Sequence, residues 1–275
     1  SRSPMRPRRR GNPTSGAFPT AANTGVPAGW TPAATHTSDL RITKAGSVVE
    51  NVRLVNANLV IEAPNVTVKR VEILGGRIFN DPGSKCMNGL VLEEVSVLRA
   101  PGQKTRTADP SAVGTGGYTA RRVKIDGLPE AFRVGGRSLG CGPVTIQDSF
   151  ANVVSPDECG DWHGDGIQGY DGPALTVRNV TLNLKELRGC PGTAPFFYPA
   201  DQGNTSVDID KLLVNGGGYP FRLGMPGKVR GLRIVDGSWF YGPIEVKCGA
   251  LSEWEAQVAS ADGTKTVKSI PCSTR

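Results

Sequence analysis

Apolar and polar residues alternate in short runs along most of the chain, in a form that recurs through residues 47–234. The form is apolar-x-apolar-x-x-apolar-x-apolar, as in Val66, Val68, Val71 and Ile73. Alternation at every second residue is typical of a strand with one buried face, and the two-residue gap predicts a corner between two such strands. The position after the gap serves as the anchor of each copy. Successive anchors are separated by 19 to 32 residues: Val52, Val71, Val95, Val123, Ser149, Val180, Leu212 and Leu232.

A strand repeat of this length, without helical periodicity, has few structural solutions. Leucine-rich repeats need a ladder of Leu and Asn that is missing here, and propeller blades need four strands and about 40 residues. One turn of a parallel β-helix needs about 20 residues plus its loops, and parallel crossovers are right-handed. We therefore predict an all-β, single-domain right-handed parallel β-helix (solenoid) of about eight coils with a C-terminal cap. The predicted segments are an N-terminal arm and lead-in over 1–38, the solenoid over 39–248, and a cap and tail over 249–275, with a short helix or irregular cap over 251–260.

A second column of short segments supplies a third strand for each coil. The segments run from Leu59-Val60-Ile61 and Arg77-Ile78-Phe79 to the Ile244–Lys247 region, and their flanking residues are apolar. Flanking residues should point inward and middle residues outward, although a slip of one residue would reverse this. The predicted outward ladder consists of Arg133, Gln168, Phe197, Arg222 and Glu245, with Lys247 two residues further along.

Extra chain length falls at one edge of the predicted coils, in residues 99–111, 152–166 and 184–195. Loops stacked beside the outward ladder would wall a groove, and Arg133, Arg222 and Lys247 on that ladder predict that the groove is basic. A groove of this shape suits a linear polymer.

Composition and charge narrow the classes of partner. The 36 Gly and 21 Pro suit the many corners of a solenoid. The net charge of +7 includes five arginines within residues 1–10, and without them the rest of the chain carries only +2. A nucleic-acid partner would rest on that arm alone, so none is predicted. No apolar run approaches the roughly 18 residues that a membrane span needs, so no membrane partner is predicted either.

The six cysteines contain no C-x-x-C pair, which argues against zinc and thioredoxin-like sites. Three disulfides in a secreted protein are the favoured interpretation, with buried free thiols as the alternative. The favoured pairs are Cys248 with Cys272, which would tie down the C-terminal tail, and then Cys159 with Cys190.

Residues 161–171, DWHGDGIQGYD, are the most unusual segment of the chain. They contain one of only two histidines, His163, together with Asp165, Trp162 and several glycines. His163 could act as an acid or base or hydrogen-bond a substrate, and Asp165 could orient it or bind a cation. The alternative is a loop-to-strand corner in which Asp165 caps backbone N–H groups and His163 is solvated.

The phrases PNVTVKRVEI, EAFRVGG and HGDGIQG resemble those of secreted actinobacterial β-helix proteins. The resemblance extends over about Phe18 to Cys248 and points to the pectate-lyase-like superfamily. That superfamily contains polysaccharide lyases, glycoside hydrolases, epimerases and phage tail-spike depolymerases. The resemblance implies a carbohydrate-active protein, but the superfamily shares a coil more than an active site.

The hydrolase motifs of that superfamily are incomplete here. Polygalacturonase-like enzymes carry N-T-D, D-D and G-H-G on successive coils, and this chain has no Asp-Asp pair and no G-H-G. Hydrolysis needs two opposed carboxyl groups, for which only Asp165 and Glu245 are clear candidates. The pectate-lyase W-I-D-H signature is also absent, so pectate itself is not indicated.

Pectate-lyase-like enzymes use an Arg or Lys base, often with calcium bridging the uronate. The resemblance therefore predicts a secreted lyase that cleaves an acidic, uronate-containing polysaccharide by β-elimination. In this reaction Lys247 or His163 would remove the C5 proton, Arg222 or Arg133 would neutralise the carboxylate, and Tyr198 or His163 would protonate the leaving O4. The predicted catalytic residues are His163, Asp165, Arg222 and Lys247. The predicted substrate-binding residues are Arg133, Gln168, Tyr198, Phe197, Glu245 and Trp162.

Two alternatives stay open. One is a glycoside hydrolase that uses Asp165 and Glu245 in the same groove, and the other is a non-catalytic carbohydrate-binding or tail-spike-like adhesin. A calcium requirement is also open, with Asp165, Asp201 and Glu245 as the oxygen donors that such a site would use.

Overall fold

The computed structural model describes residues 17–273, and this part of the chain is built from β-strands. The arginine-rich arm of residues 1–10 lies outside the described residues. Within the described range there is no α-helix, only three short 3-10 segments. These are η1 (Pro82–Ser84), η2 (Arg137–Leu139) and η3 (Cys248–Ala250).

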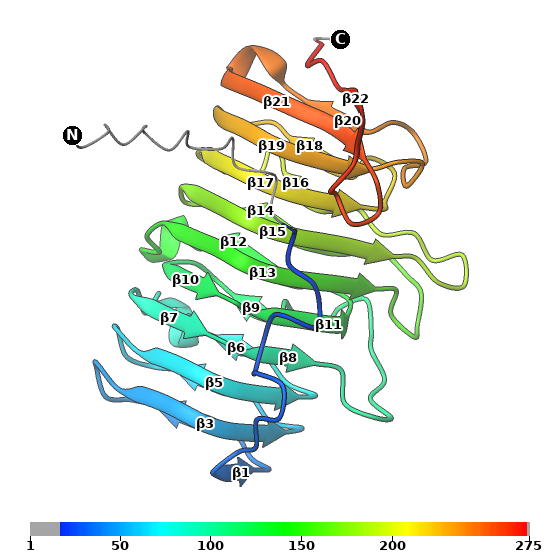
Figure 1. Ribbon diagram of the computed structural model, residues 1–275. Helices are drawn as coiled ribbons and strands as arrows, with labels where there is room; N and C mark the ends of the chain where they lie inside the picture. Colours follow the sequence, from blue (N-terminus) through cyan, green and yellow to red (C-terminus); the bar gives the residue numbers. More distant parts are fainter. Residues whose placement is uncertain (1–16, 274–275) are drawn as a thin grey trace, which may run out of the picture.

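Two long sheets run along the molecule, and Figure 1 shows the larger one in front of the smaller one. The smaller sheet has nine strands in the order β2-β4-β6-β9-β12-β14-β16-β18-β20. Every pairing between strands is parallel except that of β21 with β22. This arrangement is consistent with a β-helix-like solenoid. The strands of the smaller sheet are β2 (Leu40–Ile42), β4 (Leu59–Ile61), β6 (Ile78–Phe79), β9 (Val113–Gly114), β12 (Phe132–Gly135), β14 (Asp165–Tyr170), β16 (Ala194–Tyr198), β18 (Phe221–Leu223) and β20 (Ile244–Val246).

The larger sheet contains thirteen strands. Its main path is β1-β3-β5-β7-β10-β13-β15-β17-β19-β21-β22, and β8 and β11 extend the rows of β7 and β10. The bounds are β1 (Ala34–His36), β3 (Val48–Val55), β5 (Thr67–Leu74), β7 (Leu90–Glu93), β8 (Ser96–Leu98), β10 (Tyr118–Arg121), β11 (Lys124–Leu128), β13 (Val144–Val154), β15 (Leu175–Lys185), β17 (Val207–Asn215), β19 (Gly227–Val235), β21 (Leu251–Ala259) and β22 (Thr266–Ser269).

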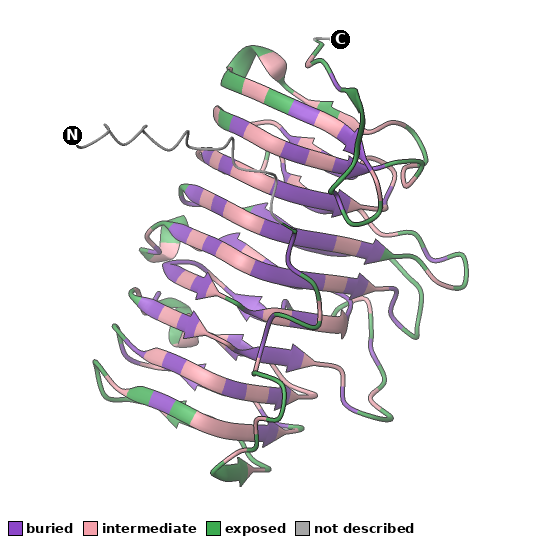
Figure 2. Cartoon of the chain, viewed as in Figure 1, coloured by how far each residue is buried: buried purple, intermediate pink, exposed green. Residues whose placement is uncertain are grey.

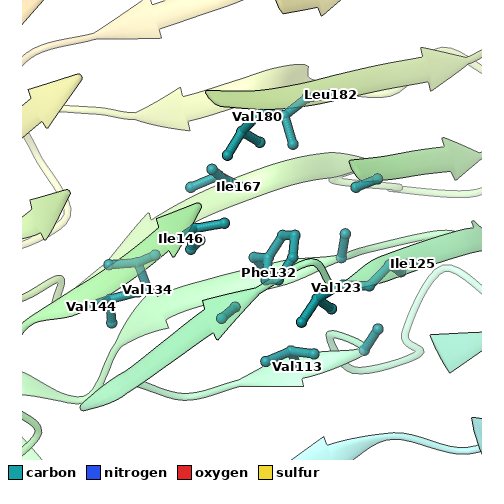
Figure 3. Close-up of a cluster of buried hydrophobic side chains, with 14 of the residues drawn as sticks. Val113, Val123, Ile125, Phe132, Val134, Val144, Ile146, Ile167, Val180 and Leu182 are labelled. Atoms are coloured by element: carbon teal, nitrogen blue, oxygen red, sulfur yellow. The ribbon is translucent and has the colours of Figure 1, made fainter. Parts of the chain in front are cut away.

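The core lies between the two sheets and follows the alternation of the strands. In β12, Phe132 and Val134 are fully buried while Arg133 between them points outward. Figure 3 shows Phe132 packed among aliphatic side chains from both sheets, including Val123 and Val180. Figure 2 shows the same alternation as buried and partly exposed bands along each strand.

Each predicted corner is formed by a residue with left-handed backbone conformation. The residue directly before every one of the eight anchors has a positive φ, between 49° and 68°. Such a residue turns the chain sharply, so that two alternating strands meet at an angle. The two-residue gap in the repeat is therefore confirmed as a corner. The corner residues are Asn51, Arg70, Glu94, Arg122, Asp148, Asn179, Lys211 and Gly231.

The corner at Asn179 offers a test of this geometry. Asn179 has a φ of 57° and its amide donates to Asp148 Oδ1 at 2.7 Å. Asn179→Gly and Asn179→Val both remove that hydrogen bond, but only Val, which is β-branched, meets the steric penalty of the left-handed region. We expect the Val variant to be less stable than the Gly variant by about 1–2 kcal/mol, as measured by urea unfolding. Equal stability of the two variants would contradict the assignment of this corner.

Two details of the predicted strands are wrong. In β6 the register is one residue later than predicted, so Phe79 rather than Ile78 points outward, because Ile78 pairs with the buried Leu59. Residues 251–259 form strand β21 instead of a helix or irregular cap. This segment keeps the alternation of the repeat and pairs with β19, so the sheet continues into the C-terminal region.

All six cysteines are paired. The bonds Cys248–Cys272 and Cys159–Cys190 confirm the two favoured pairs, and Cys86–Cys141 is the third. Three disulfides are compatible with an extracellular protein. Among residues 17–273, no helix is long and apolar enough to cross a membrane.

The lead-in crosses the outer face of the larger sheet. Figure 1 shows it as the dark blue trace that runs across the strands before it enters β1. Phe18 is buried against Leu213 and Val235 on the sheet. Further along the lead-in, the amide of Val26 donates to Ser96 Oγ at 3.0 Å.

Candidate functional site

The predicted ladder is present on the outer face of the smaller sheet. The strand register pairs Arg133 with Gln168, Gln168 with Phe197, Phe197 with Arg222, and Arg222 with Glu245. These residues therefore follow one another on successive strands, β12 to β20. The next residue of the same row is Gly114, because Val113 pairs with the buried Phe132.

Arg222 is the best-placed cation of the ladder. Its guanidinium lies 4.9 Å from the centre of the Phe197 ring. Its Nη2 and Nε donate to Glu245 Oε1 at 2.8 and 3.1 Å. A ring and a carboxylate on the two neighbouring strands thus fix the planar group, and its remaining N–H groups are free to bind an anion.

A hollow of about 630 Å³ opens beside Arg222, and we call it the arginine hollow. One wall is the loop after β15, and the other wall holds Tyr219, Phe240 and Tyr241. Phe240 and Tyr241 are 81% and 71% exposed, an unusual state for large aromatic side chains. Exposed rings beside a cation are typical of a ligand-binding surface. The residues that line it are Glu186, Gly189, Pro191, Gly192, Thr193, Gly218, Tyr219, Arg222, Phe240 and Tyr241.

A second hollow of about 540 Å³ lies on the other side of the Tyr219–Tyr241 pair, and we call it the tail hollow. The ring centres of these two tyrosines are 5.6 Å apart, and both residues line both hollows. Glu245 and the C-terminal residues Ile270 and Pro271 complete the tail hollow. The Cys248–Cys272 disulfide holds this part of the tail in place. The two hollows thus follow each other along the end of the ladder.

Glu186 is a functional candidate that the sequence interpretation missed. It lies in the edge loop after β15 and lines the arginine hollow together with Arg222. Glu186 is exposed at the surface, and partial loss of hydration raises the pKa of its carboxyl above the usual value, the direction that suits a proton donor. The only signal in the sequence was its position in residues 184–195, one of the three long edge loops.

A buried polar cluster lies further down the same face. Asp165 is fully buried and accepts a hydrogen bond from the amide of Ala194, while its Oδ2 has no partner. Burial, and then the charge of Glu130, raise the pKa of Asp165 well above its usual range. Gln168 Oε1 and Arg133 Nε are likewise buried without a partner, and Arg133 pairs with Glu130 at 2.9 Å.

The enclosure of Asp165 contradicts one role predicted for it, and the ion pairs of the ladder contradict the charge predicted for the groove. Asp165 is enclosed, and the described residues show no contact between it and His163, so it does not orient His163. The ladder arginines Arg133 and Arg222 are each paired with a glutamate. The face is therefore not a basic groove but a row of compensated charges.

His163 and Lys247 lie at the margins of this face. The His163 side chain is 63% exposed on the loop before β14, and its Nε2 is 3.6 Å from Asp161. Lys247 is exposed at the end of β20, just before η3. Neither residue lines the arginine hollow or the tail hollow.

Two predicted substrate contacts are wrong because the side chains are buried. Tyr198 is completely buried, and its hydroxyl is 2.7 Å from the carbonyl oxygen of Pro173, because alternation in β16 turns Tyr198 inward. Trp162 is 5% exposed, and its indole N–H donates to the carbonyl of Pro129. Both residues hold the loops in place and do not face the groove.

The described residues do not form a cluster of metal-binding side chains. No group of three or more His, Cys, Asp or Glu side chains gathers within residues 17–273. Asp165, Asp201 and Glu245, the donors considered for calcium, therefore do not form a shared site.

Comparisons of the chain with protein-family models, with curated proteins and with solved structures found no match. The resemblance to the pectate-lyase-like superfamily therefore stays a prediction from the sequence phrases.

Proposed function

We propose that this protein binds an acidic, uronate-containing polysaccharide along the outer face of the smaller sheet and cleaves it by β-elimination. The observation that carries the proposal is the arginine hollow, which joins exposed aromatic rings to a guanidinium held over the ring of Phe197. Sugar rings pack on such aromatic faces, and the free N–H groups of Arg222 suit a uronate carboxylate. The fold on which this rests is a right-handed parallel β-helix of the pectate-lyase-like type, in a secreted protein.

In the proposed reaction Arg222 neutralises the uronate carboxylate. This acidifies the C5 proton, because negative charge that spreads onto the carboxylate during elimination is stabilised. Glu186, which lines the arginine hollow together with Arg222 and whose carboxyl pKa is raised, protonates the leaving O4. His163 and Lys247 are the candidate bases, and either would have to reach the substrate from the margin of the groove.

A glycoside hydrolase is the second candidate, and one observation favours it. Glu186 has a raised pKa, and Glu245 is held as an ion pair with Arg222. An acid and a carboxylate in different environments are what hydrolysis requires. Glu186 would then replace the enclosed Asp165 in the pair predicted from the sequence.

The reaction type can be tested on a panel of uronate polymers. Elimination creates an unsaturated uronate that absorbs in the ultraviolet, and hydrolysis creates reducing ends without that absorbance. We expect the absorbance to rise with at least one polymer. Reducing ends alone would favour the hydrolase, and binding without either product would favour a carbohydrate-binding adhesin.

Removing the Tyr241 ring should weaken binding of acidic oligosaccharides. Tyr241 is 71% exposed and forms part of both hollows, so Tyr241→Ala takes away stacking area without opening the core. We expect about tenfold weaker binding in calorimetric titration with oligogalacturonate, one probe of this class. Tyr170→Ala is the matched control, since Tyr170 is 56% exposed and lines neither hollow. Equal losses in both variants would contradict the placement of the groove.

A further inference from the structure

We infer that the outer face of the larger sheet carries a second ligand site, which takes a neutral saccharide. This site is separate from the groove described above and does not rest on the proposed function. It is a hollow of about 500 Å³ between the lead-in and the turn that joins β21 to β22, and we call it the asparagine hollow. Its volume falls in the range of small-ligand pockets, about 300–1,000 Å³.

The floor of the asparagine hollow is made by β13, β15 and β17. One row of the floor contains Phe150, Thr181 and Leu213 on successive strands, and the next contains Asn183 and Asn215. Both asparagine side chains are partly exposed in the lining of the hollow, and no hydrogen bond joins either of them to another of the described residues. Thr181 is 4% exposed, and its buried Oγ1 also lacks a partner. The floor therefore presents amide and hydroxyl groups that the fold does not use.

The two walls come from opposite ends of the described chain. On one side Phe18 and Thr20 of the lead-in line the hollow. On the other side Asp262 lines it, and hydrogen bonds from Thr264 and Ser260 to Oδ1 lower the pKa of Asp262 to about 2. Asp262 is therefore ionised, with Oδ2 available as an acceptor.

These groups select the chemistry of the ligand. No Lys or Arg is among the described residues that line the hollow, and its one charged group is a carboxylate. Lys211 lies next to the hollow, with its Nζ 5.2 Å from the centre of the Phe18 ring, but the charged group in the described lining is Asp262, which disfavours an acidic polymer there. A peptide could not join as an extra strand, because the backbone groups of the floor are already paired within the sheet. Planar amides, a carboxylate and the Phe150 ring suit the hydroxyl groups and apolar face of a neutral sugar.

The test uses the full chain with cellobiose, maltose and mannobiose as neutral probes and digalacturonate as the acidic probe. Binding is followed by calorimetry and by the side-chain amide signals of the asparagines in ¹⁵N-labelled protein. We expect at least one neutral disaccharide to bind and to shift the Asn183 and Asn215 signals. Asn183→Ala and Asn215→Ala should each weaken that binding about tenfold.

Two controls separate this site from its surroundings. Asn152 pairs with Asn183 in the same row, but its amide donates to Asp126 and it does not line the hollow, so Asn152→Ala should bind as the unmodified protein does. Tyr170→Ala, at an exposed residue that lines none of the three hollows, should also leave neutral binding unchanged. Thermal unfolding verifies that each variant is folded.

Three results would overturn the inference. They are no binding of any neutral disaccharide, unchanged binding in both Asn183→Ala and Asn215→Ala, and binding of digalacturonate at this site as strong as that of the neutral sugars. These results would not count against the proposed function of the groove, because that function is tested separately with Arg222→Ala and uronate polymers.

Discussion

Arg222→Ala should reduce turnover of the uronate polymer about a hundredfold, the size of effect seen when one oriented donor to a developing negative charge is removed. The side chain is fixed by Phe197 and Glu245 at the edge of the arginine hollow, so its contribution depends on orientation as well as charge. Arg222→Lys should recover only part of the activity, because an ammonium group cannot reproduce the flat fork of N–H groups.

The fold should tolerate the loss of Arg222. Its partner Glu245 is 52% exposed, and exposed ion pairs stabilise proteins by about 0–1 kcal/mol, so the free energy of unfolding should hardly change. Arg178→Ala is the matched control, since Arg178 makes a similar pair with Asp208 at 2.9 Å on the larger sheet. Full activity in Arg222→Ala, or an equal loss in Arg178→Ala, would show that the reaction takes place elsewhere.

The sheets were predictable because the pattern that specifies each strand is contained within one short copy of the sequence repeat. Each copy of the repeat encodes two alternating strands and the corner between them, and every corner was found at the residue before its anchor. Errors arose where the copies were short or degenerate. Strand β6 has only two residues, Ile78 and Phe79, and so carries too little alternation to define its register.

The candidate site was predictable only in part. The outward ladder follows from strand register, which alternation encodes, and it was placed correctly from Arg133 to Glu245. The arginine hollow depends on how irregular loops of different coils pack together, and the sequences of these loops show no repeating pattern. Glu186, Tyr219 and Tyr241 come from three different loops and meet at Arg222, and nothing in their sequence spacing indicates this.

The charge of the groove was also predicted wrongly from the sequence. Arg133 and Arg222 suggested a basic groove, but Glu130 lies three residues before Arg133, and Glu245 is the register partner of Arg222. In both cases an ion pair with a nearby glutamate compensates the charge of the arginine, so the count of arginines overstates the positive charge of the ladder. An acidic substrate would therefore bind the free N–H groups of a guanidinium whose charge Glu245 already compensates, which favours ligands whose carboxylate binds together with ring contacts.

Asp165→Asn should make the protein more stable at neutral pH. Burial holds the pKa of Asp165 well above the value of about 3.9 for an unfolded chain. Between these two pKa values the folded protein keeps a proton that the unfolded chain has lost, so the stability contributed by this group falls as the pH rises through that window. Asn has the same shape, still accepts the hydrogen bond from Ala194 and never ionises. We expect a gain of about 1–3 kcal/mol at neutral pH, close to the penalty of a buried group without a partner.

The pH dependence makes this prediction specific. Unfolding by urea at several pH values should show a loss of stability above about pH 4 in the unmodified protein and a flatter profile in Asp165→Asn. Asp171→Asn is the opposite-sign control, because hydrogen bonds from Ser138 lower the pKa of Asp171, and that stabilisation is present above the unfolded value and lost as the pH falls. Asp171→Asn should therefore be less stable at neutral pH. If Asp165→Asn kept the unmodified profile, the carboxyl would be ionised in the folded protein, and an unrecognised cation or solvent channel would have to reach its Oδ2.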